Sequence, residues 1–116
     1  MDSSDTQDIA VKLAPLLSAL SHPTRLQILL HLAKYIDCPA WNIANQLPIS
    51  KSTVSQHMAK LKEAGLIECD ADGTSQRYRL SDNTFALLKA YFLNFINEIE
   101  ASKDNKLECC PKNGCS

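Results

Sequence analysis

Apolar residues recur every three or four positions along most of the chain, a spacing that predicts α-helices. The clearest case has apolar side chains at Val54, Met58 and Leu61. Ser50 precedes this stretch and suits a helix N-cap, and Gly65 follows it and suits a left-handed C-terminal cap. We therefore predict an amphipathic helix between these two residues. Similar spacing predicts further helices over residues 6–20, 23–34, 39–47 and 82–101.

The helices expected over residues 23–34 and 39–47 should turn their apolar side chains toward a common core. The Asp-Cys-Pro segment between them indicates a turn. The side chains expected inside are those of Leu26, Ile28, Leu29, Leu30, Leu32, Trp41, Ile43, Ala44 and Leu47.

Two short extended segments follow the central helix. Residues 66–70 and 76–80 flank an Asp-Gly pair, which is a strong signal for a β-hairpin turn. Because side chains alternate along a strand, Tyr78 should face one side of the hairpin and Arg77 and Arg79 the other. The predicted fold class is therefore mainly α with a small β-hairpin.

The helix expected over residues 82–101 is more apolar than a small domain can bury by itself. Its apolar residues step by three and four, as in a heptad pattern. Because such a surface needs a partner, we predict that it pairs with the helix over residues 6–20 across a twofold axis, giving a homodimer. The stripe consists of Phe85, Leu88, Phe92, Phe95 and Ile99.

A chain of 116 residues is long enough for one modest domain. We assign residues 1–5 to a disordered N-terminus, residues 6–101 to a folded domain and residues 102–116 to a flexible tail. No apolar run approaches the ~20 residues of a membrane span, and the acidic, polar N-terminus is unlike a signal peptide. We expect a cytoplasmic protein with no membrane partner.

The net charge of the chain is −1, but its basic residues are unevenly distributed. Residues 22–65 hold five basic and two acidic residues, whereas residues 66–116 hold six basic and eight acidic ones. The positive segment includes the helix after Ser50, whose polar face carries short hydrogen-bonding and cationic side chains. Such groups can bond base edges and phosphates in a DNA major groove. The candidate DNA contacts on this helix are Lys51, Ser52, Thr53, Ser55, Gln56, His57 and Lys60.

A more specific signal than a generic helix-turn-helix pattern comes from four segments between residues 10 and 100. They read PTRLQILLHL, IANQL, SKSTVSQHMAKLKEAGLI and QRYRL. Together they resemble the ArsR/SmtB family, which comprises small dimeric repressors that respond to metals and metalloids. The resemblance implies a winged helix-turn-helix with element order ααααββα, dimerisation through the first and last helices, and binding to double-stranded operator DNA. It also makes the hairpin the wing, where Arg77 and Arg79 are suited to contact phosphates or the minor groove.

The sequence departs from this family at two of its usual metal sites. Members that sense arsenite, lead or cadmium often carry a Cys-x-Cys pair at the third helix, where this chain has Pro39 and Trp41. Cys38 stands alone one residue away, so we interpret it, like Cys69, as a packed thiol. Other members bind zinc with histidine in the last helix, and the last helix here has no histidine. We expect neither of these sites in this chain.

Three of the five cysteines fall within residues 109–115. Thiolates select soft ions, and trivalent arsenic and antimony favour three thiolates in a trigonal pyramid. Some arsenite-responsive members of the family use a vicinal cysteine pair beyond the last helix with a third cysteine nearby, and this tail resembles that arrangement. We predict that As(III) or Sb(III) is the inducer that releases the repressor from its operator, with no nucleotide or catalytic cofactor. The predicted ligands are Cys109, Cys110 and Cys115.

Other signals and other classes of protein stay open at this point. Cys109 and Cys110 alone suit a methylarsenite-responsive repressor, and a disulfide within the tail would make a redox- or thiol-responsive one. A thiol oxidoreductase or arsenate reductase is disfavoured, because no βα pattern surrounds a cysteine with an anion-binding loop, so we do not expect an enzyme. The intact polar face of the central helix argues against a metal-buffering protein that has lost DNA binding. A metalloid site within one subunit and one shared by two subunits are equally compatible with the sequence.

Overall fold

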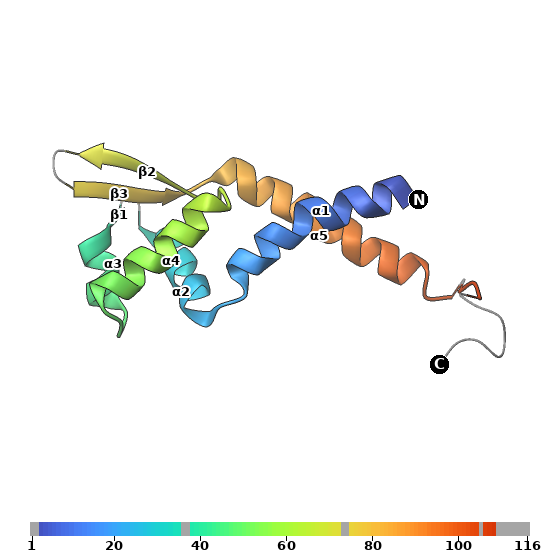
Figure 1. Ribbon diagram of the computed structural model, residues 1–116, viewed down its shortest axis with the longest axis horizontal. Coiled ribbons are helices and arrows are strands. Elements are labelled where there is room, and N and C mark those ends of the chain that lie inside the picture. Colours follow the sequence, from blue (N-terminus) through green and yellow to red (C-terminus); the bar gives the residue numbers. More distant parts are fainter. Residues whose placement is uncertain (1–2, 36–37, 73–74, 105, 109–116) are drawn as a thin grey trace.

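The computed structural model describes residues 3–35, 38–72, 75–104 and 106–108. Figure 1 shows α2, α3, α4 and the sheet gathered at one end, while α1 and α5 contact each other and extend away from that end. Helices therefore dominate the fold, as predicted, and none of those described is both long and apolar enough to cross a membrane. The elements in chain order are α1 (Ser3–Leu20), α2 (Pro23–Lys34), β1 (Cys38–Pro39), α3 (Ala40–Gln46), α4 (Lys51–Glu63), β2 (Ile67–Asp72), β3 (Ser75–Leu80) and α5 (Asp82–Ala101).

A three-stranded antiparallel sheet connects the hairpin to the helical part of the fold. Its strand order is β1-β3-β2, and the predicted hairpin is formed by β2 and β3, which pair along their whole length. The short strand β1 was not predicted, because we expected its two residues to form a turn. Instead Cys38 pairs with Tyr78 and Pro39 pairs with Arg77. Two residues are too few to show the alternation that identifies a strand in a sequence.

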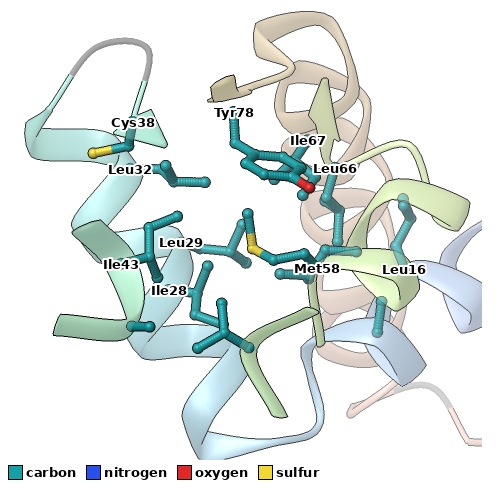
Figure 2. Packing of buried hydrophobic residues seen from close by; sticks show 14 residues of the cluster. Leu16, Ile28, Leu29, Leu32, Cys38, Ile43, Met58, Leu66, Ile67 and Tyr78 are labelled. Carbon is teal, nitrogen blue, oxygen red and sulfur yellow. The ribbon is translucent and has the colours of Figure 1, made fainter. Parts of the chain in front are cut away.

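The core lies between α2, α3, α4 and the sheet (Figure 2). Met58 of α4 reaches into its centre, beside Leu29 of α2 and Leu66, and Tyr78 of β3 lies over them. The side chains with less than 2% exposure are Ile28, Ile43, Val54, Met58, Leu61 and Leu66.

Three side chains expected in the core are exposed, so this part of the prediction was wrong. Leu26 is 45% exposed, Leu30 is 66% exposed and Trp41 is 53% exposed. An α-helix turns by about 100° per residue, so residues two positions apart lie on nearly opposite faces. Because α2 buries Ile28 and α3 buries Ile43, the residues two positions away from them point to solvent.

The helices α1 and α5 leave much apolar surface exposed. α1 begins at Ser3, so residues 3–5, expected to be disordered, belong to the helix. No residue of α5 is buried. Phe85 and Leu88 at the start of its apolar stripe pack against the core, whereas the later Phe92, Phe95 and Ile99 are 41%, 40% and 55% exposed. The end of α5 away from the sheet thus offers an apolar face without a cover among the described residues of this one chain.

Candidate nucleic-acid interface

Both ends of α4 are capped by local hydrogen bonds. The backbone N–H of Thr53 donates to Oγ of Ser50 at 3.2 Å, which confirms the predicted N-cap. At the other end Gly65 has φ +79°, and its N–H and that of Leu66 donate to the carbonyls of Lys62 and Leu61 at 2.9 and 3.0 Å. This double hydrogen bond is a Schellman motif. Its effect is to fix both the length of α4 and the direction in which the chain leaves it.

Most of the candidate residues on α4 point away from its buried side. Val54, Met58 and Leu61 anchor the inner face, each at most 1% exposed. With α3, which packs against it, α4 forms a helix-turn-helix unit in which α4 is the outer, recognition helix. Of the predicted contacts, Lys51, Ser52, Ser55, Gln56 and Lys60 are exposed, and Thr53 and His57 are half-buried.

The hydroxyl groups in the first turn of α4 are connected to one another. Oγ of Ser50 donates to Oγ1 of Thr53 at 2.9 Å and lies 3.2 Å from Oγ of Ser52. Because each hydroxyl can both donate and accept, this group holds the Ser52 and Thr53 side chains close to the helix N-terminus. A helix N-terminus attracts phosphate oxygens through its backbone N–H groups, so the first turn is suited to contact the DNA backbone as well as bases.

His57 contacts two residues outside its own helix. Its Nδ1 accepts a hydrogen bond from Nε of Arg25 on α2 at 3.2 Å. The ring of His22 lies 4.4 Å from that of His57, centroid to centroid, at an angle of 53°. Burial lowers the pKa of His57, and the neighbouring His22 and Arg25 lower it further. His57 is therefore held in its neutral form at neutral pH.

The two arginines of the wing have different surroundings from those the sequence suggested. Arg79 contacts two acids of the paired strand, with Nη2 3.2 Å from Glu68 Oε2 and Nη1 2.5 Å from Asp70 Oδ2. Arg77 is half-buried and stands opposite Asp70 in the register of β2 and β3. Tyr78 between them is 9% exposed, which confirms the predicted alternation. Since Arg79 is already paired with two carboxylates, its contact with DNA stays a prediction.

Cys38 and Cys69 are packed thiols, as expected. The Sγ of Cys38 lies 3.3 Å from Nε2 of His31 and 3.8 Å from Nδ2 of Asn42. The side chain is 2% exposed, and burial raises the pKa of its thiol. Cys69 is half-buried and, like Cys38, pairs with Tyr78 in the sheet. The thiol of Cys38 is thus held in its neutral form, and Cys69 is a partly buried residue of the sheet.

The predicted metalloid ligands Cys109, Cys110 and Cys115 lie outside the described residues. Within the described ranges no group of three histidine, cysteine, aspartate or glutamate side chains could hold a metal ion.

Sequence reasoning missed the contact between α2 and α4 through Arg25 and His57. Arg25 lies in the first turn of α2, and its partner His57 lies 32 positions away along the chain. His22 caps α2, because its Nδ1 accepts the N–H of Thr24 at 3.2 Å.

Known DNA-binding proteins are similar to this chain over most of its length. A family model described as a helix-turn-helix domain matches residues 20–70, from the end of α1 to β2. The transcriptional repressor SdpR of Bacillus subtilis is 38% identical over 80 residues, which are 69% of this chain and 88% of SdpR.

Solved structures agree with this relationship. A possible transcriptional regulator for arsenical resistance is 33% identical with a TM-score of 0.65, over 79% of this chain and 96% of that one. A homodimeric winged helix-turn-helix domain from Mycobacterium bovis, a possible ArsR-family regulator, is 25% identical with a TM-score of 0.64, over 92% and 96% of the two chains. Together with the capped recognition helix and the wing, these similarities show that the chain belongs to the ArsR/SmtB family of winged helix-turn-helix proteins, which are DNA-binding transcriptional repressors and not enzymes.

Proposed function

We propose that two copies of this chain bind double-stranded operator DNA with their α4 helices in successive major grooves, about one helical turn or ~34 Å apart. The observation that carries the proposal is the division of α4 into a fully buried face and a capped, polar face that is open to a partner. Since the proposed partner is operator DNA, we place the action of the protein in the cytoplasm.

The second copy should dock through α1 and α5. Both helices present apolar side chains on the same side of the molecule, around a hollow of about 280 Å³ that includes Ile9, Leu13 and Phe95. Covering this face with its symmetry mate would remove apolar surface from water, at about 25 cal/mol per Å². The twofold axis would then fix the distance between the two α4 helices. This distance has to match the spacing of the two half-sites in the DNA.

The proposed contacts to bases or adjacent phosphates are Ser52, Thr53, Ser55, Gln56 and His57. The proposed contacts to the DNA backbone are Lys51, Lys60 and Arg77. A test is the affinity of Gln56→Ala for a labelled duplex selected by the wild-type protein from a random pool. A lost base contact should weaken binding by about 1–3 kcal/mol and relax the preference at one base pair. Gln27→Ala, an exposed glutamine on α2, is the matched control. Equal effects from the two variants would remove α4 from the interface.

We further propose that As(III) or Sb(III) is the inducer and that Cys109, Cys110 and Cys115 bind it. Three considerations support this. The tail supplies the number of thiolates that trivalent arsenic favours, it follows directly on the exposed end of α5, and a solved relative is described as a possible regulator for arsenical resistance. Metalloid binding by the tail, which follows α5 in the chain, would change the angle between the subunits. A coupling of about 1–3 kcal/mol, or 5- to 150-fold in affinity, would be enough to release the operator.

The inducer is tested by fluorescence anisotropy of the selected duplex under reductant, with arsenite, antimonite, methylarsenite and zinc titrated into the complex. We expect release by arsenite in the wild type and in Cys69→Ser, and no release in Cys109→Ser, Cys110→Ser or Cys115→Ser. Release by methylarsenite alone, with Cys115 dispensable, would favour a two-thiol organoarsenical sensor. Release that depends on oxidation and not on metalloid would favour a redox-responsive repressor. Arsenite release that survives deletion of residues 106–116 would refute the tail site.

A further inference from the structure

Arg25 is held at two points between α1 and α4. Its Nη1 donates to the carbonyl of Ala19 at 3.3 Å, and its Nε donates to Nδ1 of His57 at 3.2 Å. Ala19 lies in the last turn of α1, where carbonyl groups have no partner within the helix and carry partial negative charge. The hydrogen bond to Ala19 therefore fixes the orientation of the guanidinium, with its Nε–H directed at His57.

This contact determines where the proton of His57 resides. A guanidinium has only donors, so the nitrogen that it contacts must be the acceptor. A neutral imidazole has one N–H, and with Nδ1 accepting, that N–H is on Nε2. Within the described part of the chain, every buried side-chain nitrogen or oxygen has a hydrogen-bond partner. Nε2 of His57 has no such partner among the described residues, so it is not a buried atom. That atom is consequently accessible from solvent on the half-buried side chain.

The groups around His57 also disfavour protonation of its second ring nitrogen. His22 packs against it from the start of α2, with its own Nδ1 accepting the N–H of Thr24. Protonation of His57 would point an N–H at the N–H of Arg25 and would add a positive charge beside that cation. Arg25 and His22 are the charged and titratable groups that lower its pKa, and burial acts in the same direction.

We infer that Arg25 is a positioning residue that fixes His57 in the Nε2–H form, so that α4 presents a hydrogen-bond donor to an acceptor atom of DNA at this position. The acceptor is N7 or O6 of a purine, O4 of thymine or a phosphate oxygen, since all accept and none donates. A histidine free to exchange tautomers would offer an acceptor part of the time and would discriminate less. The inference rests on the proposed function of α4 as the DNA-facing helix.

The direct test is nuclear magnetic resonance of the full chain with ¹⁵N-labelled histidine, which distinguishes the two tautomers by the shifts of the ring nitrogens. We expect His57 of the wild type to show protonated Nε2 and bare Nδ1 at neutral pH. Arg25→Met should give a mixture of tautomers and a higher pKa for His57. A wild-type signal from protonated Nδ1, or a tautomer unchanged in Arg25→Met, would overturn the inference. A merely structural contact would not move this signal, and thermal unfolding of both proteins checks that they are folded.

The consequence for DNA is tested with the selected duplex. His57→Met should weaken binding about 2- to 12-fold, the range for one net hydrogen bond, and Arg25→Met should weaken it in the same direction. His57→Gln should retain most of the affinity, because its amide offers an oxygen to Arg25 and an N–H to DNA. Equal losses in His57→Gln and His57→Met would overturn the donor role.

The failure of this inference can be told apart from failure of the proposed function. If Gln56→Ala weakens binding while His57→Met does not, α4 faces DNA and the donor role of His57 is overturned. If neither does, the assignment of α4 fails and the role of His57 in DNA binding fails with it. Duplexes with 7-deazapurines or methylphosphonates then identify which acceptor the wild type uses.

Discussion

Replacing Gly65 by alanine should destabilise the protein through the backbone and not through packing. Gly65 has φ +79°, a conformation that costs other L-residues roughly 1–2 kcal/mol. An added Cβ would have Thr84 Oγ1 as its nearest neighbour at 3.5 Å, which is an ordinary contact. The unfolded alanine variant has lower conformational entropy, which offsets this cost by about 0.4–1 kcal/mol. We therefore expect a net loss of ~1 kcal/mol in the free energy of unfolding.

The assay is urea unfolding followed by circular dichroism, at one protein concentration because the proposed dimer would make stability depend on concentration. Gly65→Asn is the matched variant, since asparagine adopts the left-handed conformation more readily than alanine does. The expected order of stability is wild type, then the asparagine variant, then the alanine variant. Where the backbone conformation suits alanine, a change from glycine to alanine usually stabilises. An alanine variant at least as stable as the wild type would therefore show that the positive φ of Gly65 carries no such cost.

Three further predictions concern the core, the dimer and pH. Met58→Ala should cost about 2–5 kcal/mol of stability, measured by the same unfolding assay, because it removes a buried side chain from the centre of the core. Phe95→Glu should give monomers by sedimentation velocity and abolish tight DNA binding, whereas Asn94→Glu, which adds the same charge to the neighbouring exposed position, should stay dimeric. Stability should fall as the pH decreases below 6.5, the ordinary pKa of histidine, because the pKa of His57 is lowered in the folded chain and unfolding then takes up a proton. His57→Gln should reduce this dependence, and an identical pH profile would contradict it.

Local signals in the sequence were sufficient for α4 and the hairpin. The cap at Ser50, the left-handed cap at Gly65 and the spacing of Val54, Met58 and Leu61 each belong to a few neighbouring residues, and they all indicate the same helix. Such agreement between independent local preferences is what makes an element predictable without its surroundings.

Features that depend on distant parts of the chain were not predictable in this way. Trp41 was placed inside because it is apolar, but the face of a short helix that becomes buried is chosen by the elements that pack on it. The hydrogen bond between Arg25 and His57 joins two helices, and no sequence pattern within either helix predicts it. A two-residue strand such as β1 exists because a partner strand is available beside it.

The strand β1 has a mechanical consequence. It leads directly into α3, and it pairs with β3, the returning strand of the wing. The helix-turn-helix and the wing are thereby joined by backbone hydrogen bonds, and α2 also contacts β3. Because of these connections, we expect each subunit of the proposed dimer to contact DNA as one rigid unit. An inducer of the proposed dimer would then act by changing the angle between the two subunits, without changing the fold of either one.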